Sequence, residues 1–201
     1  MKKALLIVDM LNDFVNEDGK LPVPKAGELV ENIQKLMEKA DIVVYANDAH
    51  AEDDLEFKVW PPHCVKGTYG AELVKELAPR DKAVILEKQD LSVFTNKDAD
   101  RTLKNLGVNE LYVVGVATEY CVRGAVLEIE TKYGTLVKGA IDRGYKVNLV
   151  VDAIAGVDKI TLPDGVVVPE TFGKVNKTLL EMGKAGAEPL YTAQALEEMV
   201  K

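Results

Sequence analysis

The sequence predicts a doubly wound α/β fold, in which helices cover both faces of a mostly parallel β-sheet to give three layers. Short runs of branched aliphatic residues recur along the chain, and segments of helical length with apolar residues three and four positions apart lie between them. Runs without polar alternation are typical of strands buried on both faces. Strands that alternate with helices form right-handed crossover units, so ligands bind beyond the carboxyl ends of the parallel strands.

Apolar runs mark the predicted strands. In chain order they are LLIV at 5–8, IVVY at 42–45, AVILE at 83–87, YVVG at 112–115 and KVNLVVD at 146–152. All of these runs fit strands that are covered on both faces. Functional side chains are therefore expected directly after them.

Three groups of apolar residues predict helices. They are Leu29, Ile33, Leu36 and Met37, then Leu73, Val74 and Leu77, and then Leu103 and Leu106. A further helix is expected to begin at Thr118, whose side chain can cap it. Between Cys121 and Arg143 three glycines each weaken a helix by about 1 kcal/mol relative to alanine, so we expect two helical pieces there. Residues 156–170, rich in turn signals, are expected to be a connecting loop.

The composition is that of a globular chain, with 47% hydrophobic and 29% charged residues among 201. This length suits a single domain over residues 1–201. A net charge of −8 disfavours binding to nucleic acid or to an anionic membrane. No apolar stretch approaches the roughly 18 residues of a membrane-spanning helix, and the start KKALLIVDM does not resemble a secretory signal. The two cysteines are therefore expected to be free thiols in a cytoplasmic protein.

Cys121 is the predicted nucleophile. In the first turn of its helix, backbone amides and the positive end of the helix dipole favour a thiolate and can bind an oxyanion. The structural alternative is a buried, inert cysteine. Cys64 directly follows His63, but neighbouring residues of an extended strand point to opposite sides, so this pair does not make a working dyad.

Two histidines and an acid favour a divalent metal site. Asp48 and His50 follow the second strand two positions apart, on the same side of an extended segment, and His63 follows in WPPHC. One carboxylate and two imidazoles suit a transition metal with positions open for water or substrate. Asp54 and Glu56 are candidates for a further ligand. The alternative is that each histidine is a solvated or hydrogen-bonded loop residue.

Histidines that bind a metal cannot serve Cys121 as a base, so a carboxylate is required. Asp9, at the end of the first strand, is the natural candidate, although an acid there can also cap a helix. A cation such as Lys88, at the end of the third strand, would stabilise the thiolate by charge pairing. A lysine that leaves a buried strand is more often a surface residue.

These residues stand in blocks that resemble the isochorismatase-like cysteine hydrolases and, within them, the nicotinamidases. The blocks are LLIVDMLNDF, NDAH, WPPHCVKGTYGAE, LEK followed by SVF at 92–94, and GVATEYCV, and they span most of the chain. The resemblance implies a three-layer α/β/α fold. It also implies the deamidation of nicotinamide to nicotinic acid and ammonia through a thioester intermediate, with pyrazinamide as a further substrate.

The catalytic roles carried over from the resemblance fall on the residues already singled out. Cys121 attacks the carboxamide, Asp9 shuttles protons and Lys88 stabilises charge. The bond between Val116 and Ala117 is expected to be cis, and the backbone amides of Ala117 and Cys121 are expected to form the oxyanion hole.

The same resemblance implies how the substrate is bound. Asp48, His50 and His63 would hold a divalent ion, most often zinc, with iron and manganese as the other choices. That ion would receive the pyridine nitrogen of nicotinamide. Phe14 and Trp60 match the aromatic residues that sandwich the pyridine ring.

Other functions are compatible with the sequence. A related cysteine amidohydrolase acting on a carbamoyl or ureido compound needs the cysteine triad but no metal. A non-catalytic binding or scaffold protein of the same fold needs neither. The segment between Leu127 and Gly144 is longer than the short helix usual in the family, and it is a candidate subunit interface of a homo-oligomer.

Overall fold

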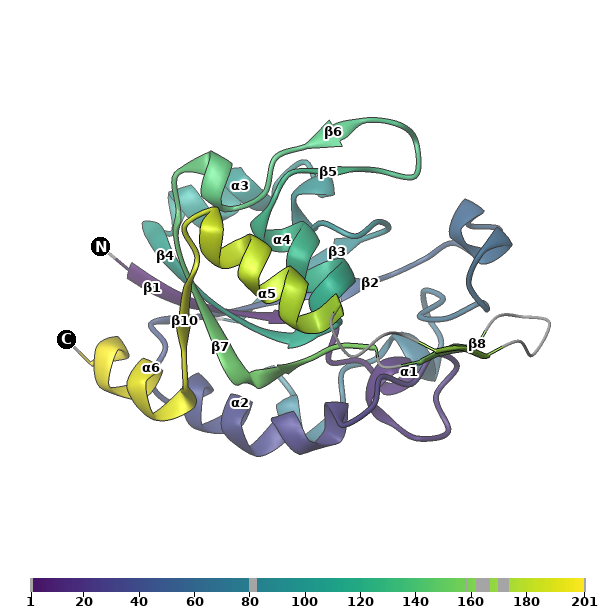
Figure 1. Cartoon of the computed structure of the whole chain (residues 1–201), viewed down its shortest axis with the longest axis horizontal. Helices are drawn as coiled ribbons and strands as arrows, with labels where there is room; N and C mark the ends of the chain where they lie inside the picture. The colour runs from purple at the N-terminus through teal and green to yellow at the C-terminus, as the bar shows by residue number, and fades with distance from the viewer. Residues whose placement is uncertain (1, 80–82, 158, 162–166, 170–173, 201) are drawn as a thin grey trace.

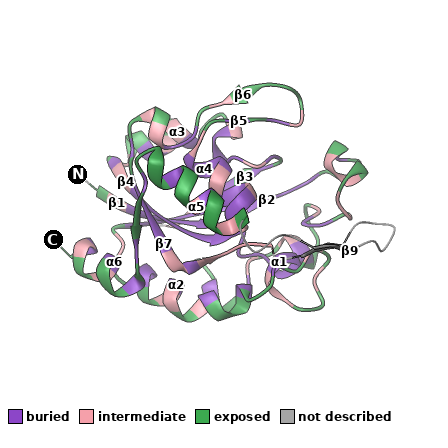
Figure 2. Ribbon diagram, viewed as in Figure 1, coloured by how far each residue is buried: buried purple, intermediate pink, exposed green. Residues whose placement is uncertain are grey.

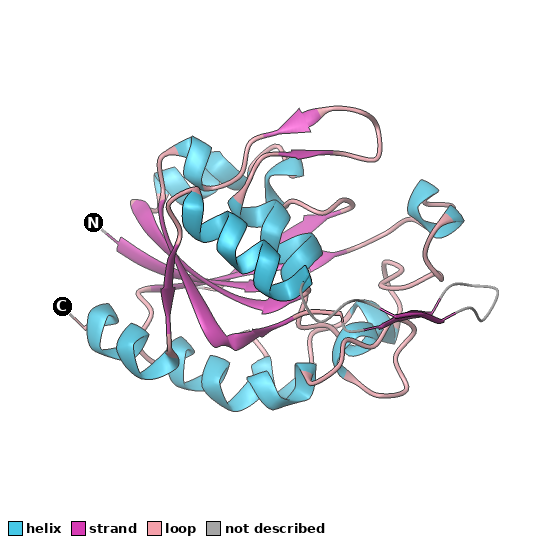
Figure 3. Cartoon of the chain, viewed as in Figure 1, coloured by secondary structure: helices cyan, strands magenta, loops and turns pink. Residues whose placement is uncertain are grey.

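The centre of the computed structural model is a parallel β-sheet. Within residues 2–79, 83–157, 159–161, 167–169 and 174–200, which the structure describes, this sheet has six strands in the order β10-β7-β4-β1-β2-β3 (Figures 1 and 3). They are β1 (Lys2–Val8), β2 (Ile42–Asp48), β3 (Val84–Lys88), β4 (Val108–Val116), β7 (Lys146–Ala155) and β10 (Glu188–Leu190). All neighbouring pairs are parallel. The predicted fold class is confirmed, and of the six strands of this sheet the sequence patterns missed β10.

Helices cover both faces of the sheet (Figure 1). α3 (Ala99–Asn105), α4 (Arg123–Val126) and α5 (Lys174–Lys184) lie over one face, and α2 (Val30–Met37) and α6 (Thr192–Met199) lie over the other. Successive strand residues point to opposite faces, so Leu6 of β1 packs in the core under α3 and α4, while Leu5 and Ile7 pack in the core under α2. Figure 2 shows the central strands buried between these two layers.

Shorter elements connect the main ones. A short helix α1 (Asn12–Val15) follows β1, and one-turn helices are η1 (Ala26–Leu29), η2 (Leu55–Lys58), η3 (Tyr69–Ala71), η4 (Lys75–Leu77), η5 (Val93–Thr95) and η7 (Ile141–Arg143). A π-helix, η6, spans Thr118–Val122. Two antiparallel hairpins pair β5 (Ile129–Glu130) with β6 (Leu136–Val137) and β8 (Lys159–Thr161) with β9 (Val167–Pro169) in the described part of the chain. None of the described helices is long and apolar enough to cross a lipid bilayer.

The strand register brings functional side chains to one end of the sheet. Asp48 pairs with Lys88 at the last position of β2 and β3, and Asp9 directly follows β1. β4, on the other side of β1, leads into the π-helix that carries Cys121. Because all these strands are parallel, the four residues gather at the carboxyl end, where the sequence predicted a site.

Two sequence predictions for the crossover from β2 to β3 are wrong. Among the described strands β3 lies at the edge of the sheet, and Ile85 and Glu87 are exposed, so AVILE is not covered on both faces. The group Leu73, Val74 and Leu77 marks the single turn η4 and a bridge to Leu11 rather than an α-helix. Three apolar residues within five positions fit one buried turn as well as a helix, which explains the error.

Predictions for the later connections also need correction. The segment from Cys121 to Arg143 has helical turns at its two ends, but the β5–β6 hairpin lies between them. Gly134 lies in the turn of this hairpin with φ +72, a conformation that favours glycine, so it marks a turn and not a weak helix. The stretch 156–170 contains the β8–β9 hairpin, while its turn signals at 163–165 lie outside the described residues.

Gly115 provides a test of the close packing between β4 and β1. It pairs with Val8 at φ +106, and a Cβ atom there would lie 2.1 Å from the Val8 carbonyl oxygen. We expect Gly115→Ala to lower the free energy of unfolding by about 3 kcal/mol or more. Gly144→Ala is the matched control, because Gly144 also has a positive φ but its Cβ would meet no heavy atom within 4 Å. Its expected loss is about 1 kcal/mol. Equal losses in urea unfolding would contradict this account.

Candidate active site

The Lys88 ammonium is the hub of a buried charge cluster. Its Nζ lies 2.8 Å from Asp9 Oδ2 and 2.6 Å from Asp48 Oδ1, and it donates a hydrogen bond to Cys121 Sγ at 3.3 Å. The Asp48 backbone amide donates to Asp9 Oδ1 at 2.8 Å, which fixes the second oxygen of that carboxylate. All four side chains are buried. The structure therefore brings together the three residues of the predicted catalytic set, and it adds Asp48 to them.

Burial and charge pairing set the ionisation of this cluster. Burial alone would lower the pKa of Lys88, but the charges of Asp48 and Asp9 outweigh it and raise this pKa well above its ordinary value. Burial opposes ionisation of Asp48, but Lys88 and His50 hold the pKa of its carboxyl below the ordinary range. Lys88 and Asp48 are thus an ion pair at neutral pH.

The pKa of the Cys121 thiol is higher than the sequence prediction of a stabilised thiolate implies. Burial raises the pKa of the thiol well above its ordinary value, and Lys88 offsets this only in part, because the charges of Asp9 and Asp48 act in the same direction as burial. Burial, followed by repulsion from Asp48, raises the pKa of Asp9 to about 6. A protonated thiol therefore faces a carboxylate whose proton affinity is raised towards neutrality, as proton transfer between them requires.

The residues around Cys121 also differ from the predicted helix start. The π-helix begins after Ala117, and Thr118 makes no capping hydrogen bond with its side chain. The Val116–Ala117 peptide bond is cis, as the resemblance implies. Both thiols are free, and Cys64 is fully buried, with its backbone amide donating to Asp13 Oδ2 at 2.7 Å. Burial raises the pKa of the Cys64 thiol far above its usual range, so Cys64 packs in the core as a neutral thiol.

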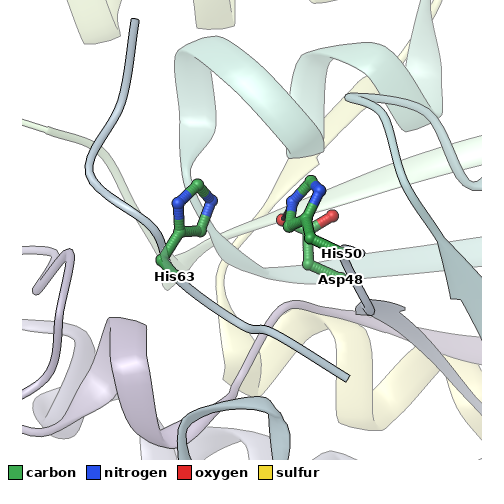
Figure 4. A group of neighbouring side chains, drawn as sticks. All are labelled: Asp48, His50 and His63. Atoms are coloured by element: carbon green, nitrogen blue, oxygen red, sulfur yellow. Dashed lines mark ion pairs between the residues drawn. The ribbon is translucent and has the colours of Figure 1, made fainter. Parts of the chain in front are cut away.

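The predicted metal ligands lie together at the end of β2. Ligand atoms of Asp48, His50 and His63 lie within 4.8 Å of one another, and Figure 4 shows His63 opposite the other two side chains. His50 Nδ1 donates to Asp54 Oδ2 at 3.0 Å, and His63 Nδ1 donates to the Pro61 carbonyl oxygen at 2.8 Å. These acceptors leave Nε2 of each ring as the atom available for a ligand.

The donor set fits a divalent cation. His50 Nε2 is buried without a hydrogen-bond partner among the described residues, and the nearest Asp48 oxygen is 3.6 Å away. Burial disfavours protonation of His50, but Asp48 and Asp54 outweigh it and raise the pKa of His50 to about 9. A metal ion bound at Nε2 would take the position of that proton. Two imidazole nitrogens and one carboxylate oxygen are the donors that zinc and related ions prefer.

Asp54 and Glu56, both candidates for a further ligand, have different environments. Asp54 accepts hydrogen bonds from His50, from the Glu56 amide and from Lys132. It therefore orients His50, and both of its oxygens are already engaged in hydrogen bonds. Glu56 Oε1 lies 3.9 Å from His63 Nε2. Burial, and then repulsion from Asp48, raises the pKa of Glu56 to about 7. Glu56 is therefore the better candidate for completing the ligand set.

A pocket at the carboxyl end of the sheet connects the two groups. It is lined by Asp9 and Cys121 from the catalytic set, by Asp48, Glu56 and His63 from the metal group, and by Phe14, Trp60, Leu91, Ala117 and Tyr120 among others. Trp60 contacts Tyr120 edge to face, with ring centroids 5.5 Å apart, and Phe14 contacts His63 at 5.3 Å. His50 and Lys88 are buried and are not among the residues that line this pocket. A largely apolar pocket with a few polar groups suits a small aromatic molecule.

Sequence patterns missed two supporting residues of the site. The buried Asp13 accepts hydrogen bonds from the amides of Lys20 and Cys64, so it ties together two loops that line the pocket. Lys132 contacts Asp54 from 78 positions along the chain. Asp13 was visible in the block DMLNDF, but its partners are amides that no side-chain pattern reveals. Lys132 has no signal in the sequence.

Known proteins share this fold and this sequence pattern. The model of the isochorismatase domain matches residues 3–161. The nicotinamidase/pyrazinamidase of Mycobacterium tuberculosis is 33% identical over 178 residues, which cover 79% of this chain and 89% of that protein. The structure of the pyrazinamidase of Pyrococcus horikoshii in complex with zinc aligns with a TM-score of 0.76 at 31% identity, covering 95% of this chain and 99% of that one. For the N-carbamoylsarcosine amidase of Thermoplasma acidophilum the TM-score is 0.73 at 28% identity, with 96% and 97% covered. A domain match over more than half of its residues shows that this chain belongs to the isochorismatase family.

Proposed function

We propose that this protein is a metal-dependent nicotinamidase, which hydrolyses nicotinamide to nicotinic acid and ammonia through a thioester on Cys121. Family membership and the nicotinamidases among its relatives make the chain a hydrolase of amide bonds. The observation that carries the finer assignment is that one pocket contains both groups of side chains. Cys121 and Asp9 line it, and so do the metal-ligand candidates Asp48 and His63. A pyridine carboxamide has a reactive carbonyl carbon and a ring nitrogen, and these two groups of side chains suit its two ends.

In the proposed complex the pyridine ring lies between Phe14 and Trp60. Both line the pocket, and aromatic rings bind a flat heterocycle through offset or edge contacts. The carboxamide carbon then faces Cys121 Sγ. This orientation holds the substrate for attack and excludes water from the buried cluster behind it.

Proton transfer is assigned to Asp9. Asp9 accepts the thiol proton as Cys121 Sγ bonds to the carboxamide carbon, and Lys88 stabilises the developing thiolate at 3.3 Å. The backbone amides of Ala117 and Cys121 stabilise the oxyanion of the tetrahedral adduct. The adduct collapses as the amide nitrogen takes the proton from Asp9 and leaves as ammonia. Asp9 then deprotonates the water that attacks the thioester carbon, the bond to Cys121 Sγ breaks, and nicotinic acid leaves. The proton on Asp9 returns to Cys121 Sγ, which restores the thiol.

A divalent ion, zinc by first choice and iron or manganese otherwise, would be held by Asp48 and by Nε2 of His50 and His63, with Glu56 as a further ligand. When bound, it supplies a Lewis acid for the pyridine nitrogen and so positions the ring. Asp48 has a second task, because its Oδ1 pairs with Lys88. A chain of contacts from Asp48 through Lys88 to Cys121 therefore connects the metal ligands to the nucleophile.

The fold also accommodates the alternative of a carbamoyl- or ureido-directed amidohydrolase, since the N-carbamoylsarcosine amidase shares it. That reaction requires the cysteine cluster but not the metal donors. Two observations favour the metal-dependent nicotinamidase. His50 Nε2 has no hydrogen-bond partner among the described residues, and the hydrogen bond at Nδ1 of each histidine leaves Nε2 available for a metal ion.

Substitution of the nucleophile tests catalysis by Cys121. Cys121→Ser is expected to lower the rate of ammonia release from nicotinamide on the order of a thousandfold or more, because a buried hydroxyl is far less acidic than a thiol. Cys64→Ala is the matched control and should retain activity, since Cys64 lies outside the pocket lining. Ammonia release by Cys121→Ser at the wild-type rate would exclude the thioester route.

The aromatic wall is tested by Trp60→Ala. Loss of the ring contact is expected to raise KM for nicotinamide about tenfold, with a smaller change in kcat, because Trp60 binds the ring and takes no part in proton transfer. Steady-state kinetics with nicotinamide and pyrazinamide measure both constants. An unchanged KM for both amides would remove Trp60 from the substrate site.

Metal removal separates the two candidate reactions. Exhaustive chelation is expected to reduce nicotinamide hydrolysis to less than about a tenth, and added zinc, manganese or iron(II) should restore it. The measurement pairs ammonia release with the metal content of the protein. Full activity in metal-free protein would refute the nicotinamidase assignment and favour a carbamoyl or ureido substrate.

A further inference from the structure

The turn of the β5–β6 hairpin is fixed against the active-site end of the sheet. The Lys132 backbone amide donates to Asp90 Oδ2 at 3.0 Å, and Asp90 is a buried residue two positions beyond Lys88. The turn is closed by a hydrogen bond from the Thr131 amide to the Thr135 carbonyl at 2.9 Å, and Thr131 Oγ1 accepts from the Thr135 amide at 3.2 Å. The start of the Lys132 side chain is therefore held in place by the hairpin itself.

The Lys132 side chain extends from this turn to the acids beside the metal ligands. Its Nζ contacts Asp54 Oδ1, lies 3.9 Å from Glu56 Oε2, and is only 13% exposed. The other oxygen of Asp54 accepts the hydrogen bond from His50 Nδ1 at 3.0 Å. A continuous chain of polar contacts thus joins the hairpin to the imidazole of a ligand, through one carboxylate.

We propose that Lys132 is a positioning residue of the metal centre, which holds Asp54 against His50 and Glu56 beside His63, so that the β5–β6 hairpin is part of the structure that supports the ligands. Among the described residues Lys132 forms no hydrogen bond or ion pair with Asp48, His50 or His63, and it acts on them through the two acids. This inference rests on the metal centre of the proposed function, and it assigns a role to the segment between Leu127 and Gly144.

A simple charge effect of Lys132 would have the opposite sign. A cation near the site repels a divalent ion, so removal of its charge alone would tighten metal binding. Removal of a residue that orients a ligand weakens metal binding, because the carboxylate that fixes His50 loses its own partner. The direction of the change in metal affinity therefore distinguishes positioning from bulk electrostatics.

Cobalt(II) is a suitable probe, because its visible absorption reports the number and geometry of its ligands. The dissociation constant for cobalt is measured by competition with a chelator for the wild-type protein, Lys132→Met, Lys132→Arg and Lys138→Met. Lys138 is an exposed lysine on the same segment and serves as the matched control for loss of one charge. Melting temperatures verify that each variant is folded.

Lys132→Met is expected to raise the cobalt dissociation constant about tenfold and to change the absorption band. Lys132→Arg should restore most of the affinity, because a guanidinium also reaches two carboxylates, and Lys138→Met should match the wild type. In an Asp54→Asn background, Lys132→Met should add little further loss, since Lys132 acts mainly through Asp54.

Unchanged or tighter cobalt binding by Lys132→Met, with an unchanged spectrum, would overturn the inference and leave the nicotinamidase proposal intact. If Lys132→Met does not fold, Lys132→Gln takes its place, and unchanged or tighter cobalt binding by that variant would overturn the inference instead. A wild-type protein that binds no cobalt would refute the metal centre and the inference together.

Discussion

The ion pair between Lys88 and the two acids Asp9 and Asp48 is the constraint on which the site depends. Transfer of a charged ammonium into the interior costs several kcal/mol, and only partners in good geometry offset this cost. Those partners come from the ends of β1 and β2, so the register of three adjacent strands must be exact to within one residue. The charge that a nucleophilic cysteine needs is thus supplied by the same register that builds the core.

Asp48 couples the two halves of the site. One of its oxygens pairs with Lys88 and the other faces His50, so a change at the ligand group alters the field at Cys121. The two histidines are held by acceptors of different kinds, a carboxylate for His50 and a peptide carbonyl for His63. His50 is therefore the more basic donor, and its orientation depends on the contacts of Asp54. The hydrogen bond that orients His63 instead goes to the backbone of its own loop.

The fold and most of the site were predictable because both follow from local patterns. Apolar runs identify the strands, and in a parallel sheet the residue after each run lies at the functional end, which is why Asp9, Asp48 and Lys88 were found. β10 was missed because Glu188, Pro189 and Leu190 form no apolar run. The raised pKa of the Cys121 thiol and the Lys132 contact were not predictable, because each sums the effects of side chains from distant segments.

The position of β3 in the sheet has a consequence for how the protein loses function. β3 is held on one side by β2 alone among the described strands, yet its last residue is the cation of the site. Edge elements of a sheet open locally at a lower free energy than the central strands. We therefore expect inactivation on warming to begin with local opening of β3, which would withdraw Lys88 while β1 and β4 stay closed. The local stability of the edge strand β3, more than that of the core, would then determine how long the active site stays assembled.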